Sequence, residues 1–174
     1  MDFLPALVVQ PESNEDIVGI HLLNQAAFDR DNEANLVDNL RKADAVTLSL
    51  VAKTDQAVLG HILFSPMKII DGDHITPAVG LGPLAVHPGF QRRGIGSKLV
   101  RTGLSMLVER GHSIIIVLGH PWFYPKFGFK PAHIYGIHLE HKVPKDVFMV
   151  QALKPGALEG VQGIAKYHAA FDDV

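Results

Sequence analysis

Six consecutive residues near the middle of the chain, Gln91-Arg92-Arg93-Gly94-Ile95-Gly96, have the types and the spacing of an anion-binding turn. The two glycines allow the backbone to turn tightly and to approach a ligand closely. If a helix begins here, its first N–H groups have no partner within the helix and lie at the positive end of the helix dipole. Such a group of amides binds anionic oxygens, phosphates above all, and the two arginines add positive charge beside it.

The same residues are also compatible with an ordinary strand-to-helix turn that carries solvated arginines. Two common nucleotide motifs are excluded, because the chain has no Gly-x-x-x-x-Gly-Lys-Ser/Thr loop and lacks the preceding Gly-x of a dinucleotide fingerprint. The turn therefore indicates an anion site without identifying the ligand.

The apolar pattern predicts a strand before this turn and a helix after it. The strand is Ala78 to Val86, and apolar residues then recur at helical spacing from Ile95 to about Glu109. Gly111 stands where the helix should end, and the apolar run 113–118 predicts a buried strand. Strand, helix and strand in this order form a parallel crossover unit.

The remaining pattern is typical of a protein that mixes helices and strands. A short first strand is predicted over residues 7–9, and two amphipathic helices over 17–27 and 33–42. Two more strands of an antiparallel meander are predicted over 46–52 and 57–70. A helical turn over 122–127 and two late strands over 134–139 and 147–153 complete the pattern. Residues 155–174 are Gly-rich at first and weakly patterned, so the placement of this tail is left open.

Residues Leu84 to Gly96, Leu-Ala-Val-His-Pro-Gly-Phe-Gln-Arg-Arg-Gly-Ile-Gly, resemble the acyl-CoA-binding motif of the GNAT superfamily of N-acetyltransferases. That motif is a strand, x-Pro, two or three residues, and then Gln/Arg-x-x-Gly-x-Gly/Ala. A second block, Gly119 to Phe129, is similar to the superfamily's aromatic-Tyr-x-x-x-Gly-Phe segment. The two blocks are separated by one helix and one strand, as in the superfamily, and the resemblance covers roughly residues 78–131.

The resemblance implies an α/β (α+β) GNAT fold with a mixed central sheet of six to seven strands, flanked by helices, in which strands 4 and 5 splay apart into a V. The pantetheine arm of acetyl-CoA would lie in the V along the fourth strand, and the pyrophosphate would lie on the turn. Gly80, Gly82 and Pro83 fit an interruption of that strand, although a kinked edge strand would also explain them. The implied cofactor-binding residues are Leu84, Ala85, Val86, Gln91, Arg92, Arg93, Gly94, Ile95, Gly96 and Ser97.

The resemblance also implies an enzyme, an acyltransferase that moves the acetyl group of acetyl-CoA to a primary amine by direct attack on the thioester. The amine would belong to a small molecule, a peptide or a protein. Tyr124 would be the general acid for the departing thiolate, because a phenol with a pKa of about 10 keeps its proton at neutral pH. Packing among its aromatic neighbours is the other interpretation of Tyr124. Backbone amides at a bulge would stabilise the oxyanion.

The general base and the acceptor site stay open. The predicted fourth strand, Thr76 to Val86, contains no acidic residue, although many relatives place a glutamate there. The candidates are His61, His120 and Glu33, together with a chain of waters. The polar residues Asp29, Arg30 and Asp31, with Glu33, are candidates for the rim of the acceptor site, or else form a solvated helix connection.

Composition and charge narrow the classes of function. The chain has 174 residues, of which 47% are hydrophobic and 20% charged, so we expect a single folded domain over residues 1-174. The formal net charge is −2 and no basic run exceeds two residues, which argues against a nucleic-acid partner. The absence of cysteine excludes disulfides and thiolate zinc sites. His138 and His141 would point to opposite faces of a strand, so no metal site is expected.

The same features bear on location and on competing functions. Residues Met1 to Pro5 lack the features of a signal peptide and no apolar run could span a bilayer, so we expect a cytoplasmic protein with no membrane partner. A homodimer is possible. One alternative function is a non-catalytic acyl-CoA-binding module, which the missing acidic residue of the fourth strand favours. Another is a structural or dimer-forming domain, which would not respond to CoA.

Overall fold

One mixed sheet of nine strands runs through residues 6–174, the part of the chain that the computed structural model describes. Its strands are β1 (Val8–Pro11), β2 (Leu48–Lys53), β3 (Val58–Asp71), β4 (His74–Val86), β5 (Ile114–Leu118), β6 (Lys130–Pro131), β7 (Ile137–Leu139), β8 (Phe148–Ala152) and β9 (Gly163–Lys166). The α-helices are α1 (Ile17–Phe28), α2 (Asn32–Lys42) and α3 (Ile95–Glu109). Short 3-10 helices are η1 (Asn14–Asp16), η2 (Pro88–Phe90), η3 (Tyr124–Phe127), η4 (Ala132–Tyr135) and η5 (Ala169–Asp173). The segment Met1 to Pro5 lies outside the described residues.

Most neighbouring strands are antiparallel, in the order β1-β2-β3-β4-β5-β8-β6. β4 and β5 are parallel, and α3 is the crossover between them. β9 pairs with β3 on one side and with β7 on the other. The mixed sheet, the meander and the crossover unit predicted from the sequence are confirmed. The short strands β6, β7 and β9 bring the sheet above the predicted six to seven strands.

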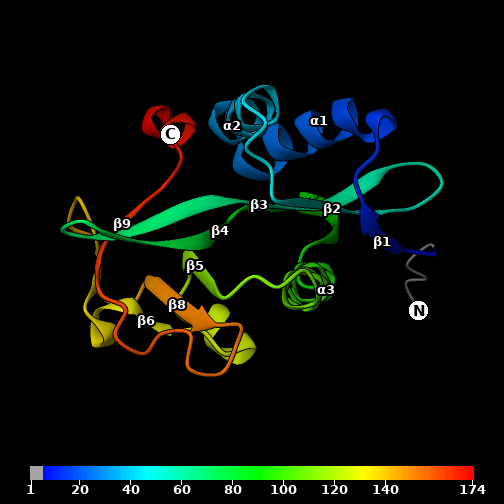
Figure 1. Ribbon diagram of the computed structural model, residues 1–174. Helices are drawn as coiled ribbons and strands as arrows, with labels where there is room; N and C mark the ends of the chain where they lie inside the picture. The colour runs from blue at the N-terminus through cyan, green and yellow to red at the C-terminus, as the bar shows by residue number, and fades with distance from the viewer. Residues whose placement is uncertain (1–5) are drawn as a thin grey trace.

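The helices cover both faces of the sheet. Figure 1 shows α1 and α2 on one face of β2, β3 and β4, and α3 on the opposite face. Each helix turns an apolar side inward, because residues such as Leu36 and Leu40 of α2 and Leu99 and Leu107 of α3 are buried at helical spacing. The layers follow from this, since each apolar stripe needs a sheet face to cover it.

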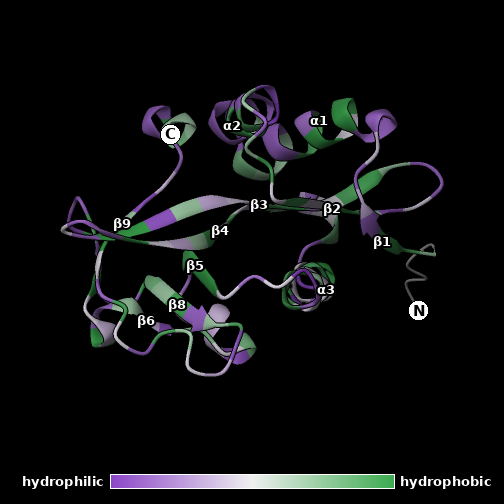
Figure 2. Ribbon diagram, viewed as in Figure 1, coloured by the Kyte–Doolittle hydropathy of each residue, from purple (hydrophilic) through white to green (hydrophobic). Residues whose placement is uncertain are grey.

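β5 separates two packed cores. Ile115 and Val117 belong to the cluster beneath α3, whereas Ile114 and Ile116 belong to a cluster on the opposite face. The strand is hydrophobic along its length (Figure 2), as expected for a strand covered on both faces. Alternate side chains of β4 and β5 therefore face opposite sides of the sheet, and each contacts the core on its own side.

In the C-terminal third, one predicted strand is partly wrong, and the tail over 155–174 has a defined place. A strand over 134–139 is wrong in its first half, because η4 extends to Tyr135 and Gly136 then adopts a φ of 73° that an extended strand does not accommodate. The strand predicted over 147–153 is confirmed to within one residue at each end. The unplaced tail forms β9 and then η5, which lies beside α2.

Candidate active site

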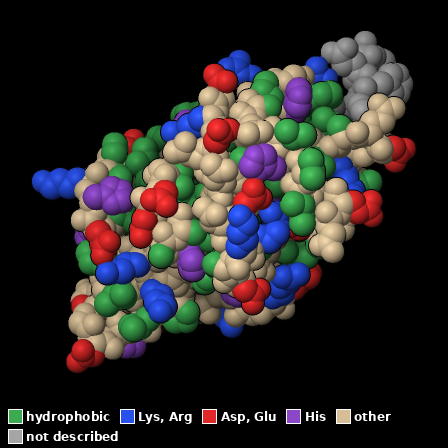
Figure 3. All heavy atoms as spheres, turned by 90° about the horizontal axis from the view of Figure 1, so that it is seen from above, with side chains coloured by type: hydrophobic (Ala, Val, Ile, Leu, Met, Phe, Trp, Pro, Cys, Tyr) green, Lys and Arg blue, Asp and Glu red, His purple; other side chains and the backbone are tan. Residues whose placement is uncertain are grey.

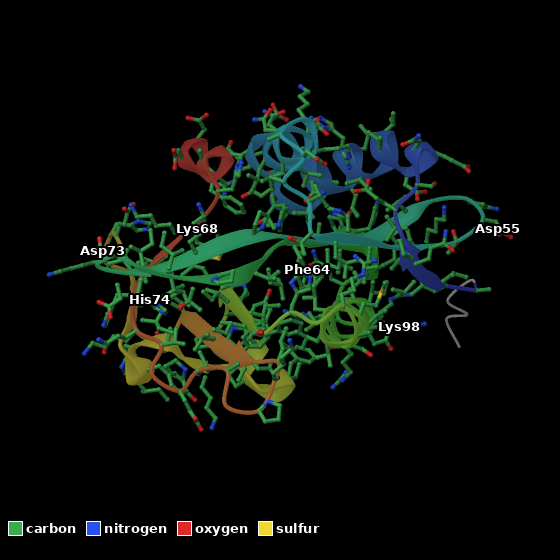
Figure 4. All side chains as sticks on the ribbon, in the orientation of Figure 1. Asp55, Phe64, Lys68, Asp73, His74 and Lys98 are labelled. Atoms are coloured by element: carbon green, nitrogen blue, oxygen red, sulfur yellow. The ribbon has the colours of Figure 1, made fainter. Side chains whose placement is uncertain are left out.

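β4 separates from β5 half-way along its length. Three register pairs join the two strands, of which the last is Leu81 with Val117. On the other side of β4, Gly82 and Pro83 together stand opposite Leu63 of β3, which makes a β-bulge at this level. The neighbouring Phe64, labelled in Figure 4, lies near the middle of the long β3. The predicted splay between the fourth and fifth strands is therefore confirmed, and it begins at the bulge.

The peptide groups of Leu84 and Val86 face the opening. The N–H of His87 donates to the carbonyl of Leu59 on β3 at 2.8 Å. Because alternate residues of a strand direct their peptide groups to the same edge, Ala85 also faces β3, while Leu84 and Val86 face away from it. The side chain of Gln91 donates from Nε2 to the carbonyl of Val86 at 3.1 Å. An extended ligand with amide groups could pair with this free edge as an added strand does.

The turn after β4 has the geometry of an amide nest. Gly94 has a φ of 85°, and a Cβ at this position would meet open space. The helix begins at Ile95, and its first hydrogen bond runs from the N–H of Lys98 to the carbonyl of Gly94 at 3.0 Å. The N–H groups of Ile95, Gly96 and Ser97 therefore have no partner within α3. Gln91, Arg92, Arg93 and Gly94 are exposed, so the nest is open to a ligand.

The two sequence blocks meet beside this nest. A Cβ on Gly96 would lie 3.7 Å from Cζ of Phe123 and 3.8 Å from Cγ2 of Val86, which is ordinary contact distance. The ammonium group of Lys126 lies 4.4 Å from the centre of the Phe123 ring. The start of α3, the free edge of β4 and the second block thus border one opening, with basic side chains around it.

Tyr124 lies at the C-terminal end of β5, among aromatic rings. Its ring centre is 4.9 Å from that of Phe123 and 5.7 Å from that of Phe129, both edge to face. Gly119 leaves room for the ring, because a Cβ there would overlap it. Burial raises the pKa of the Tyr124 phenol to about 12, so the group stays protonated at neutral pH. Its hydroxyl makes no hydrogen bond with any other described residue.

His61 is sealed in the core beneath α1. It is fully buried, with Nε2 2.8 Å from Oγ of Ser49 and Nδ1 3.3 Å from Nδ2 of Asn24. Burial, with a smaller effect of Arg41, lowers the pKa of His61 to about 3. The imidazole is therefore neutral and has no contact with solvent, as expected of a structural core histidine.

The other two candidate bases lie in different surroundings. Glu33 is buried and its carboxylate is bound by Arg30, whose Nε lies 3.0 Å from Oε2. His120 is exposed and stacks on Trp122 with ring centres 5.1 Å apart. Of the three, His120 is the one that a solvent molecule reaches directly. The rim residues Asp29, Arg30 and Asp31 form the exposed connection between α1 and α2.

Tyr167 also lies near the opening, and sequence reasoning missed it. It follows β9, and a Cβ on Gly80 of β4 would lie 3.4 Å from Cε1 of Tyr167. The tail carries no motif that singles out this tyrosine, and the short apolar pair Ile164 and Ala165 is the one local sign of a strand before it.

Other features of residues 6–174 lie away from this opening. Two hollows of about 310 and 220 Å³ lie elsewhere, one between the start of β4 and Lys154 and one between α2 and η5. On the face that carries α1 and α2, acidic and basic side chains are interspersed (Figure 3). Among residues 6–174, no group of three or more His, Asp or Glu side chains could hold a metal ion. Within the same range no helix has the length and the apolar character to cross a membrane.

Comparison with known proteins decides the family. A family model described as an acetyltransferase (GNAT) domain matches residues 45–131, which include the bulge, the nest and Tyr124. The chain is 35% identical over 167 residues to the uncharacterised N-acetyltransferase YhbS of Escherichia coli K12, an alignment that covers 95% of this chain and 99% of that protein. This chain belongs to the GNAT family of acetyltransferases.

Solved structures of GNAT proteins share the whole architecture. The crystal structure of Escherichia coli YhbS in complex with CoA has a TM-score of 0.91 and 34% identity, over 99% of this chain and 95% of that one. A GNAT family acetyltransferase from Brucella melitensis in complex with acetyl-CoA has a TM-score of 0.80 and 38% identity, over 96% and 99% of the two chains. This GNAT chain is therefore an N-acetyltransferase by family and by fold.

Proposed function

We propose that this GNAT enzyme transfers the acetyl group of acetyl-CoA to a primary amine by direct attack of the amine on the thioester. The observation that carries the proposal is the convergence of three features on one opening: the free edge of β4, the amide nest at the start of α3 and the phenol of Tyr124. The complexes of Escherichia coli YhbS with CoA and of the Brucella melitensis protein with acetyl-CoA support it.

The cofactor would use the opening in two parts. The pantetheine arm would lie along Leu84 to Val86, where peptide groups point away from β3. The pyrophosphate would lie on the amides of 94–97, where the helix N-terminus favours negative charge, with Gln91, Arg92 and Arg93 beside it. Gln91 would then exchange its hydrogen bond with the Val86 carbonyl for one with the ligand.

The chemistry needs little from the side chains. The uncharged amine attacks the carbonyl carbon, a C–N bond forms, and backbone amides near the bulge stabilise the oxyanion. The C–S bond then breaks, and Tyr124 donates its proton to the departing sulfur. Since the amine loses one proton and the thiol gains one, the proton released by the amine restores the phenol. Burial keeps the phenol protonated at neutral pH, which a proton donor requires before the C–S bond breaks.

The proposed base is His120 or solvent. The burial of His61 and the ion pair of Glu33 with Arg30 argue against both, which leaves His120 and solvent. Proton loss through solvent suffices for an amine with a modest pKa. We also infer that residues 1–174 act as a single domain and that the enzyme works in the cytoplasm. The continuous sheet and the absence of cysteine support these two inferences.

A non-catalytic acyl-CoA-binding module is the second candidate. It is favoured by β4, which has no acidic residue in its 13 positions. A turnover assay separates the two candidates. Thiol release from acetyl-CoA can be followed directly with a thiol reagent, because the protein has no cysteine of its own to react. Thiol release that depends on an added amine would identify the enzyme, and binding without any release would identify the module.

The first experiment is isothermal titration with acetyl-CoA, CoA and NADH. We expect micromolar binding of acetyl-CoA and CoA, and none of NADH. Gly94→Glu should weaken the binding by about 100-fold or more, because it places a carboxylate at the pyrophosphate position and a side chain at a φ of 85°.

Gly72→Glu is the matched control for this titration. Gly72 also has a positive φ and open space around it, but it lies in the turn between β3 and β4. Its variant should bind acetyl-CoA as the wild type does. Absence of acetyl-CoA binding by the wild type would contradict the proposed function.

A further inference from the structure

Two tyrosines approach the opening from opposite faces of the sheet. Tyr124 belongs to the core cluster beneath α3, together with Val79 and Val117. Tyr167 packs against the cluster of the other face, together with Ile116 and Met67. Since Ile116 and Val117 are consecutive in β5, the two clusters are separated by the sheet itself except where β4 and β5 part.

The position of Tyr167 is fixed by strand register. Lys166 is the last residue of β9 and stands opposite Lys68 of β3, so Tyr167 follows at the level of Met67. The ring then lies over Gly80, which has no side chain to keep it away. Gly80 is in the last-but-one pair before β4 leaves β5. Tyr167 therefore stands at the base of the opening, on the face that carries α1 and α2.

The two phenols are close enough to affect each other. Burial raises the pKa of Tyr167, and the neighbouring Tyr124 raises it further. Neither hydroxyl makes a hydrogen bond with another described residue, and neither is among the wholly enclosed polar atoms that lack a partner. Each hydroxyl is therefore protonated, and neither is wholly enclosed.

The tail that carries Tyr167 is held in place from both sides. β9 pairs with β3 and β7, and the ring of Phe171 lies 4.6 Å from that of Tyr167. Phe171 in turn packs against the cluster formed by α1 and α2. Figure 1 shows this segment running from the sheet to the side of α2. An anchored aromatic ring of this kind can orient a ligand at little entropic cost.

We propose that Tyr167 positions the acceptor amine by accepting a hydrogen bond from its N–H on the α1 and α2 face of the opening. Tyr124 donates its proton to the departing sulfur. The inference rests on the proposed function, because it needs acetyl-CoA in the V. It divides the site by face: the cofactor is bound by β4 and α3, and the acceptor enters past the C-terminal tail. The covalent step is the one given above, and Tyr167 keeps its proton throughout.

The test compares Tyr167→Phe, Tyr124→Phe and the wild type in three assays that use thiol release or titration. These are acetyl transfer to a panel of phenethylamine, tyramine, spermidine and Nα-blocked lysine, hydrolysis of acetyl-CoA without amine, and acetyl-CoA binding. Tyr135→Phe is the matched control, since Tyr135 packs against the same cluster as Tyr167. Thermal unfolding of each variant monitors folding.

We expect Tyr167→Phe to raise KM for the accepted amine about three- to tenfold, the value of one hydrogen bond, with a smaller effect on kcat. Its acetyl-CoA affinity and hydrolysis rate should equal those of the wild type, whereas Tyr124→Phe should lose both transfer and hydrolysis. Unchanged amine kinetics, weakened acetyl-CoA binding, or acetylation of no amine in the panel would overturn the proposal. Failure of the wild type to bind acetyl-CoA would instead overturn the proposed function.

Discussion

At the scale of single residues, the two tyrosines differ in how they reach the site. Tyr124 lies in a local segment, where neighbouring aromatic rings and Gly119 hold it. Tyr167 reaches the opening through the pairing of β9 with β3, which brings together residues far apart in the chain. The pairing of strands across the sheet therefore places the second phenol, whereas packing within one segment places the first.

Replacing Tyr124 by phenylalanine should lower kcat about 10²- to 10⁴-fold, because the proton donor is lost while the ring packing stays. The acetyl-CoA affinity should be unchanged. The wild-type kcat should show no fall from deprotonation of Tyr124 between pH 6 and 10, since the acid form is the active one and burial raises its pKa to about 12. Thiol release measured across this pH range checks both statements. A Tyr124→Phe variant with the wild-type kcat would exclude Tyr124 from the mechanism.

At the scale of elements, the sequence pattern predicts β4, α3 and β5 because all three are contiguous and strongly patterned. What it does not predict is how closely α3 approaches the sheet. Gly103 faces the ring of Phe64, and a Cβ there would overlap that ring. Phe64 is fully buried, so it has little room to move. The glycine is thus needed for packing, although the apolar period alone would accept any small residue.

Gly103→Ala should therefore lower the free energy of unfolding by about 1–3 kcal/mol, as overpacking does, even though alanine favours helices by about 1 kcal/mol over glycine. Urea unfolding measures the change. Ser105→Ala, on the exposed side of the same helix, is the control and should be neutral or slightly stabilising. A more stable Gly103→Ala would show that α3 can move away from the sheet without cost.

The late elements show the limit of reading local pattern. The segment 134–139 has the composition of a strand, yet Gly136 takes a left-handed conformation and divides it into η4 and β7. β9 is four residues long and is stabilised by neighbours on both sides. Non-local pairing decides both outcomes, so the sequence motif predicts the turn and the second block but not the position of β9.

At the scale of the whole molecule, the buried histidine links folding to pH. His61 of β3 joins Ser49 of β2 and Asn24 of α1, three elements that meet only in the folded chain. Burial lowers its pKa from 6.5 to about 3. Between these two values the unfolded chain takes up a proton that the folded chain does not, so this group makes the protein less stable as the pH falls.

We expect the free energy of unfolding to fall from pH 7 toward pH 5, with His61 contributing at most about 1.4 kcal/mol per pH unit. Urea unfolding at pH 7.5, 6.0 and 5.0 measures it. His61→Gln should be less stable at neutral pH but should have a shallower dependence on pH. His138→Gln, at an exposed position, should keep the wild-type dependence. Equal slopes for His61→Gln and the wild type would contradict this origin.

The return of β9 to β3 has a kinetic consequence. β4 and β5 part at the bulge, but the half of the chain that contains β5 comes back through β9 and η5 to the half that contains β3 and α2. The two walls of the V are thus tied together behind the opening, and we expect the opening to keep its shape when acetyl-CoA binds. Acetyl-CoA should then associate in one phase whose rate rises linearly with its concentration, with no slow opening step, and Trp122, the single tryptophan and an exposed neighbour of Phe123, stands where it would sense the encounter.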